Sequence, residues 1–285
     1  MRGPTVGVCG LVGAGGKMQV TRIGRLSAQV QLGDLTVFAL SDGETVMPTD
    51  RLVGADAAAM AGADLVDGQL RLQVMAFAVR GPGGCVLIDT GAGDAWHASL
   101  GLLPQAMAEA GITADEVTAV ALTHTHVDHI SGLARKDGGL AFPKATIFVP
   151  EAEMGLFRAE PRMAHVLARA VMMQPGEGIM PGVVAVAASG HEVGHTAFLV
   201  GGNLLIWGDL IHHAAVQFAN PDVTWAFDTD ADQARATRAS VMARVVAEGW
   251  AVAGAHLAFP AIGRLSVAGA GYAFHPISMG ADWVG

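Results

Sequence analysis

The run His124-Thr125-His126-Val127-Asp128-His129 places three imidazoles and one carboxylate directly after the apolar stretch Val117–Leu122. The apolar stretch predicts a strand, and alternation in an extended segment directs His124 and His126 to the same side. Asp128 and His129 are neighbours at the start of a predicted helix, so their side chains diverge. One pair can therefore bind one ion while the other pair binds a second ion beside it. Neutral imidazole and carboxylate are suitable ligands for zinc and similar divalent metals.

A centre with two metals needs more ligands than these four, and three candidates follow later apolar runs. His191, Asp209 and His256 each come after such a run, on a short segment that contains glycine. Ligands at strand ends suit a rigid scaffold that holds a site. Taken singly, a histidine after a strand is more often structural, and an aspartate after glycine is more often a turn former. Together with the first motif, they complete a set of five histidines and two aspartates.

At this point the chain resembles the metallo-β-lactamase-fold hydrolases, and within them the methyl parathion hydrolase group, with the N-acyl-homoserine lactonases as relatives. The resemblance extends from about Gly33 to Tyr272. Besides the histidine motif, it is carried by Gly33–Val37, Leu40–Gly43, Ile88–Gly91, Gly190–Thr196, Gly208–Ile211, Ala214–Phe218 and Gly254–Gly263. The histidine motif is specific for the fold, and the last three segments are specific for the subgroup.

The resemblance implies a role for each residue. One metal would be held by His124, His126 and His191, and the other by Asp128, His129 and His256, with Asp209 bridging both. Asp89 would orient a ligand imidazole, and His195 would be a structural or orienting neighbour. We expect two zinc ions, although manganese, cobalt and iron fit the same donors.

The implied activity is that of a hydrolase in which two ions share a hydroxide that attacks an electrophilic centre. Lactones and aryl esters are the expected substrates, with phosphotriester hydrolysis as the main or a side reaction. Asp128 or His212 would transfer a proton. Lactonases of this superfamily commonly carry a tyrosine three residues after the bridging aspartate; this chain has His212 there, and imidazole can donate the same hydrogen bond.

Aromatic residues indicate the substrate class. Trp96 matches a position that lines the leaving-group pocket in the methyl parathion hydrolase group, and Phe218 and Phe259 lie near metal-binding segments. If they line the pocket, it is apolar and suits a neutral substrate; the alternative for each is core packing. The family often has Thr-Pro where this chain has Glu192-Val193, which removes a rigid turn but should spare the ligand.

Charge and sequence content argue against several kinds of partner and against two alternative functions. The net charge is −9 and basic residues do not cluster, which argues against nucleic acid or an anionic membrane surface. No apolar run approaches the length needed to cross a bilayer. A glyoxalase II-like thioesterase would be expected to have a basic C-terminal segment. Residues 251–285 contain Arg264 as their one Lys or Arg residue, which argues against this function. A non-catalytic binding protein of this fold would be expected to have lost ligands, and none of the seven is missing.

The elements that must position these residues are short strands that alternate with helical segments. Predicted strands are Leu35–Leu40, Leu72–Val79, Val86–Ile88, Val117–Leu122, Ala145–Val149, Val183–Ala187, Thr196–Val200 and Leu204–Trp207. Predicted helices are Trp96–Ala110, Glu151–Met173 and Ala231–Ala247. Gly176–Gly182 is the clearest break and is expected to divide two halves of one domain.

These elements predict an α/β (α+β) protein in which two mixed β-sheets pack together with helices outside. The resemblance makes this the metallo-β-lactamase-type αβ/βα four-layer sandwich. We expect one domain over residues 19–285, with a helical insertion near 150–175, preceded by an extension over residues 1–18. That extension is a poor secretory signal, and Met18 is an alternative start, so we expect a cytoplasmic protein. A homodimer is compatible with the resemblance.

Overall fold

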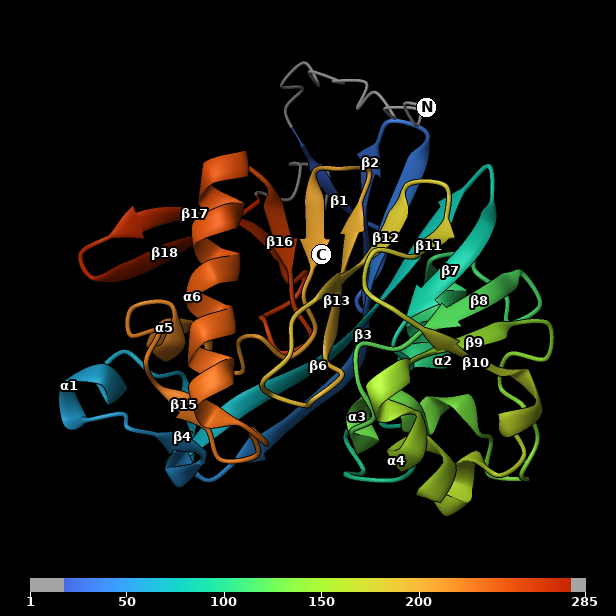
Figure 1. Cartoon of the computed structure of the whole chain (residues 1–285), viewed down its shortest axis with the longest axis horizontal. Helices are drawn as coiled ribbons and strands as arrows, with labels where there is room; N and C mark the ends of the chain where they lie inside the picture. The colour runs from blue at the N-terminus through green and yellow to red at the C-terminus, as the bar shows by residue number, and fades with distance from the viewer. Residues whose placement is uncertain (1–17, 278–285) are drawn as a thin grey trace, which may run out of the picture.

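The computed structural model describes residues 18–277, which form two mixed β-sheets with helices on their outer faces (Figure 1). The first sheet has the order β1-β2-β3-β6-β7-β8-β9-β10, with β5 paired to β6. Its strands are β1 (Val20–Arg22), β2 (Ser27–Leu32), β3 (Leu35–Met47), β5 (Leu65–Val66), β6 (Gln69–Gly81), β7 (Gly84–Ile88), β8 (Val117–Ala121), β9 (Thr146–Pro150) and β10 (Ala170–Met173). The predicted fold class is confirmed.

The second sheet has the order β11-β12-β13-β14-β16-β17-β18, and a small ribbon pairs β15 with β4. The strands of the second sheet are β11 (Gly178–Met180), β12 (Val183–Ala187), β13 (Thr196–Val200), β14 (Leu204–Ile206), β16 (Ala251–Ala253), β17 (Ile262–Ala268) and β18 (Gly271–Pro276), while the ribbon is β4 (Leu52–Val53) with β15 (Thr224–Trp225). The chain therefore crosses between the sheets after Met173, at the predicted break.

The helices are short except for the last. They are α1 (Ala57–Met60), α2 (Leu103–Glu109), α3 (Val127–Ile130), α4 (Met154–Ala159), α5 (Ala214–Gln217) and α6 (Ala231–Glu248), and among the described residues no helix is long and apolar enough to cross a membrane. The side chain of Asp230 accepts a hydrogen bond from the Gln233 N–H and caps the start of α6, and Gly249, with a φ of 65°, ends it.

The core follows the two-residue period of the strands. In β6, Phe77 packs into the cluster between the sheets, whereas Ala78 faces the cluster under α2 and α4. In β7, Ile88 and Leu87 divide in the same way. A strand that is buried on both faces reads as a continuous apolar run, which is why the central strands could be predicted.

Two helix predictions were wrong in part. In Trp96–Ala110 the helix begins only at Leu103, because Gly101 has a φ of 83° that a helix cannot continue through. In Glu151–Met173 the helix α4 ends at Ala159, because Glu160 precedes proline and is extended. Short 3-10 turns follow, and Ala170–Met173 is a strand that pairs with β9. Residues 1–17 of the predicted extension, with Cys9, lie outside the described residues, and the single-domain limits, the start at Met18 and the location stay predictions.

Candidate metal centre

Four loops bring the predicted ligands to one edge of the sandwich. They leave the carboxyl ends of β8, β12, β14 and β16 and carry the histidine motif, His191, Asp209 and His256, respectively. In the second sheet, β12 and β14 are both antiparallel to β13, and β14 is parallel to β16. The three strands therefore point the same way, so their final residues meet at the same edge.

Backbone hydrogen bonds lock these loops together. The Thr196 N–H donates to the Thr123 carbonyl over 2.8 Å and joins the two sheets beside the histidine motif. The Ala255 N–H donates to the Gly208 carbonyl over 3.2 Å, next to Asp209. Gly208 has a φ of 57°, and a Cβ there would lie 2.7 Å from the Nε2 atom of His195. Glycine is therefore required at this position both by its φ and by the close approach of the ring.

The segment from Asp209 to Asp228 is held by two buried side chains. Arg238, from α6, donates to the carbonyls of Leu210, Pro221 and Val223 over 2.7–2.9 Å. The side-chain Oε1 atom of Gln217 accepts from the backbone N–H groups of His212 and His213 over 2.7 and 3.0 Å. These hydrogen bonds fix the position of His212 relative to Asp209.

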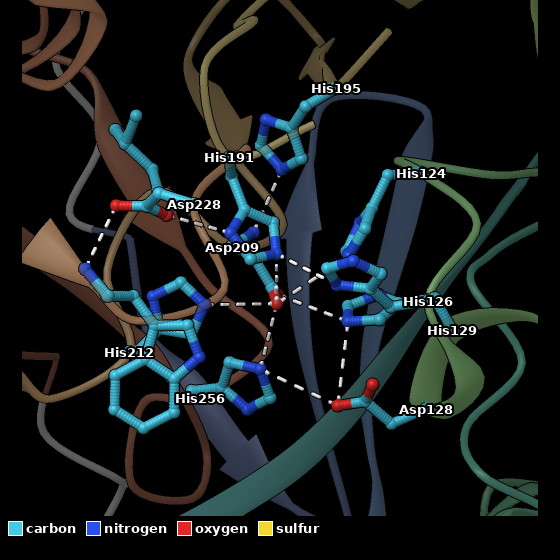
Figure 2. Close-up of polar contacts among 12 residues, drawn as sticks. His124, His126, Asp128, His129, His191, His195, Asp209, His212, Asp228 and His256 are labelled. Atoms are coloured by element: carbon cyan, nitrogen blue, oxygen red, sulfur yellow. Dashed lines mark hydrogen bonds and ion pairs between the residues drawn. The ribbon is translucent and has the colours of Figure 1, made fainter. Parts of the chain in front are cut away.

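The structure brings all seven predicted ligands together in two groups (Figure 2). The donor atoms of each group lie within 4.8 Å of one another; the groups are His124, His126, His191 and Asp209, and Asp128, His129 and His256. Asp209 lies between the two groups. Its Oδ2 atom is 3.0 Å from the Nε2 atom of His256 and 3.4 Å from that of His191, and its Oδ1 atom is 3.2 Å from the Nε2 atom of His129.

Each of these imidazoles has a partner on the ring nitrogen that faces away from the group. The Nδ1 atom of His129 contacts Asp89 at 2.8 Å, and that of His191 contacts Asp228 at 2.9 Å. The remaining contacts are His256 Nδ1 to the Gln73 carbonyl at 2.6 Å, His126 Nε2 to Glu192 at 2.9 Å and His124 Nδ1 to Thr123 Oγ1 at 3.0 Å. Partners of this kind fix the tautomer and orientation of metal-ligating histidines.

The inward-facing atoms test whether a metal fits. The Nε2 atoms of His124 and His129 and the Oδ1 atom of Asp209 are buried, and none has a hydrogen-bond partner among the described residues. Buried polar atoms without partners are costly and rare in native proteins. Convergent, buried nitrogen and oxygen donors fit divalent cations, because a bound cation would satisfy them together.

The electrostatics favour the metal-binding protonation state at His124 and Asp209, whereas at His129 and His256 burial lowers the pKa but the neighbouring carboxylates outweigh it and raise it. Burial holds the pKa of His124 well below its usual value, and burial lowers the pKa of His212 to about 3 against the opposing effect of Asp209. Burial raises the pKa of Asp209, but the neighbouring histidines outweigh it and hold that pKa well below its usual value. Neutral imidazoles and ionised carboxylates are the forms that coordinate a metal ion.

The two orienting residues predicted from the resemblance touch the site. Asp89 accepts hydrogen bonds from the Thr123 N–H and hydroxyl as well as from His129. His195 donates from Nδ1 to the Ala188 carbonyl, and its Nε2 atom accepts from the Asp209 N–H over 3.0 Å. His195 thus supports the backbone of Asp209.

Five of the donors line a cavity of about 310 Å³, namely His126, Asp128, His191, Asp209 and His256. Its apolar wall consists of Met47, Leu72, Trp96, Val127, Trp225 and Phe227, and His212 also lines it. Trp96, which is 39% exposed, additionally lines a larger cavity of about 840 Å³.

The structure does not bring the other two predicted aromatics to this cavity. Phe218 is buried and stacks on Phe274 with ring centroids 5.2 Å apart. Phe259 packs against the core beneath the Arg22 guanidinium. Both residues therefore follow the alternative of core packing, because Phe218 belongs to the cluster between the sheets and Phe259 packs against it. The cavity aromatics Trp225, in the two-residue strand β15, and Phe227, which follows it, were missed because no sequence motif marks this segment.

The contacts of Glu192 and Asp228 were also missed. Asp228 lies 37 residues from His191 in sequence, so no local spacing joins them. Glu192 occupies a position where the family often has a different residue, and this difference was the one sequence feature that drew attention to it.

Comparison with known proteins identifies the family. A family model for the metallo-beta-lactamase superfamily matches residues 70–256. Among solved structures, hydrolase AbOPH in the beta lactamase superfamily is 25% identical, with a TM-score of 0.80 over 90% of this chain and 98% of that one. AidC, a dizinc quorum-quenching lactonase solved with the product N-hexanoyl-L-homoserine, is 23% identical, with a TM-score of 0.81 over 92% of this chain and 99% of that one. No curated protein matches the chain. Because the family model spans well over half of the chain, this protein belongs to the metallo-beta-lactamase superfamily.

Proposed function

We propose that this protein is a hydrolase with two divalent metal ions, zinc being the first choice, that opens lactones or cleaves aryl esters. Phosphotriester hydrolysis, as in the methyl parathion hydrolase group that the sequence resembles, is proposed as the main or a side reaction. The observation that carries the proposal is the convergence of seven His and Asp donors, with unsatisfied buried atoms, at a cavity that five of them line.

The division of the donors follows the two groups in the structure. His124, His126 and His191 would hold one ion, and Asp128, His129 and His256 the other, with Asp209 shared. When bound, the ions would supply Lewis acidity and a nucleophile derived from water at neutral pH. The carboxylates and neutral rings hold the ions in place, and their outward hydrogen bonds keep the donor atoms aimed inward.

His212 is the proposed substrate-orienting residue. Its ring stacks on Trp225 at 4.6 Å with an interplanar angle of 8°, which fixes the plane of the imidazole. The ring lines the cavity with its Nε2 atom 3.3 Å from the Oδ2 atom of Asp209, and its Nδ1 atom has no hydrogen-bond partner among the described residues. With its pKa lowered by burial, the ring is neutral and carries one N–H, which it can donate to a carbonyl or phosphoryl oxygen of the substrate.

The cavity wall favours a neutral, partly apolar substrate. Among the described residues that line it, the side chains outside the donor set are apolar or aromatic, and none is Lys or Arg. An ester or lactone with a hydrocarbon group matches this surface, whereas nucleic acid and phosphate monoesters would need cationic side chains. The fold shared with the lactonase AidC supports lactones as the first class to test.

The test is activity of the metal-loaded protein on a panel of lactones, aryl esters and methyl parathion, with kcat/KM compared across the panel. Asp209→Ala is expected to abolish turnover of every substrate, while Asp222→Ala, which removes an exposed carboxylate, should have no effect. The proposal would be overturned if Asp209→Ala still turned over substrate, or if the purified wild-type protein contained no bound divalent metal ion.

A further inference from the structure

Glu192 and His126 form a contact that crosses from one ligand loop to another. The Glu192 Oε1 atom lies 2.9 Å from the Nε2 atom of His126. The other ring nitrogen, Nδ1, lies 3.0 Å from the Nε2 atom of His191, inside the first donor group. Glu192 therefore contacts the outward edge of the ring while the inward edge faces the proposed metal.

His191 is arranged in the same way, with Asp228 at its outward ring nitrogen and His126 at its inward one. Together the two rings indicate that a cation can bind between them. A neutral imidazole has one N–H and one lone pair. If Nε2 of His126 donates to Glu192 and Nδ1 of His191 donates to Asp228, the two remaining nitrogens, 3.0 Å apart, both carry lone pairs. Two acceptors at this distance repel each other unless a cation lies between or beside them.

His126 depends on a hydrogen-bond partner for its outward ring nitrogen more than the other ligand histidines do. Its side chain is 32% exposed, whereas those of His124, His129, His191 and His256 are between 0 and 3% exposed. Packing fixes the buried rings, but it leaves the His126 ring with freedom to rotate and to change tautomer. A hydrogen bond from the outward nitrogen removes that freedom.

Glu192 is itself held firmly enough to act in this way. Its carbonyl accepts from the N–H groups of Gly190 and His195 over 3.0 and 3.1 Å, which closes the loop around it. Its side chain also accepts a hydrogen bond from Thr229 and is 12% exposed.

We propose that Glu192 is a positioning residue that fixes His126 as the tautomer protonated on Nε2 and leaves Nδ1 as the metal donor. The inference rests on the proposed function, because it needs a metal in the first group. It assigns a role to a residue that replaces the threonine often found at this position in the family.

The test compares Glu192→Ala, Glu192→Gln and Val193→Ala with the wild type. Val193→Ala is the matched control, since Val193 is adjacent in the same loop and is 59% exposed. Zinc affinity is measured by competition with a chromophoric chelator, and the coordination geometry by the visible absorption of the cobalt-substituted protein. Circular dichroism verifies folding, and Glu192→Thr replaces Glu192→Ala if that variant does not fold.

Glu192→Ala is expected to weaken binding of one of the two ions about 10- to 100-fold and to alter the cobalt spectrum. Glu192→Gln keeps an acceptor oxygen but loses the charge, so its loss should be less than about tenfold, with a spectrum close to wild type. Wild-type affinity and spectrum in Glu192→Ala, or an equal loss in Val193→Ala, would overturn this inference and leave the proposed function intact. A wild-type protein that binds no ion would overturn both.

Discussion

Glu153 offers a sharp test of how the two ligand loops are joined. Its side chain is fully buried, and it lies in a 3-10 turn that follows β9. Oε2 accepts a hydrogen bond from the Thr125 hydroxyl over 2.7 Å, and Oε1 accepts one from the Gly194 N–H over 2.8 Å. Thr125 lies inside the histidine motif and Gly194 follows His191, so one carboxylate connects the loops that supply the first donor group.

The magnitude follows from these two bonds. A hydrogen bond to a charged group contributes about 1.5–3 kcal/mol, so Glu153→Ala should lower the free energy of unfolding by about 3–6 kcal/mol. In Glu153→Gln, the amide oxygen can still accept from Gly194 and the amide nitrogen can donate to Thr125. Because both bonds then lack the charge, we expect a smaller loss of about 1–3 kcal/mol.

The assay is urea unfolding in the presence of a chelator, so that metal binding does not contribute to the measured stability. Glu151→Ala is the control, because Glu151 lies in the same turn and is exposed, and its effect should stay within about 0.5 kcal/mol. Thr125→Val completes a double-mutant cycle, for which a coupling of about 0.5–3 kcal/mol is expected. A Glu153→Ala variant within about 1 kcal/mol of wild type, or additive effects in the cycle, would refute the reasoning.

Four further predictions concern the cavity and its supports. His212→Phe keeps the stacked ring but removes the N–H, so kcat for lactones should fall about 100-fold while two ions stay bound; loss of an ion would instead make His212 a ligand. Arg238→Met leaves the carbonyls of Leu210 and Pro221 without a side-chain donor, while the Gln217 amide still donates to the Val223 carbonyl, so the free energy of unfolding measured in urea should fall by at least about 2 kcal/mol; an unchanged value contradicts this. Burial raises the pKa of Asp42 to about 6, so the folded state binds this proton more tightly than the unfolded chain does, and the stability of wild type relative to Asp42→Asn should fall by about 3 kcal/mol as the pH rises from about 4 to 6; a flat difference refutes it. Trp96→Ala removes the side chain that lines both cavities, so the ratio of kcat/KM for long-chain over short-chain lactones should rise, and an unchanged ratio would show that the larger cavity takes no part.

The sequence predicted best those features that depend on residues close together in the chain. The central strands could be predicted because each is an apolar run bounded by turn residues, as in Val183–Ala187, which is β12 at the predicted limits. The last two strands of the second sheet, β17 and the edge strand β18, were missed because they carry exposed polar or small residues that break the apolar pattern. On α6, the buried face includes the charged residue Arg238, whose hydrogen bonds satisfy carbonyls of a segment far away in sequence.

The same distinction between local and distant contacts applies to the residues of the candidate site. The donors could be predicted because the motif places several of them together and the others follow strands. The residues that support them could not, because their contacts join distant loops: Glu153 lies 41 residues from Gly194, and Glu192 lies 66 residues from His126. Pairing at such separations is set by the docking of the two sheets, which a single sequence does not reveal.

The crossover after Met173 has a consequence for how the ions and the fold depend on each other. Each donor group takes members from both halves of the chain: His124 and His126 join His191 and Asp209, while Asp128 and His129 join His256. Because each proposed site takes donors from both halves, an ion would complete its coordination only after the halves have assembled. Bound ions would then link the two halves, so removing them with a chelator should lower the stability of the contact between the halves at that edge.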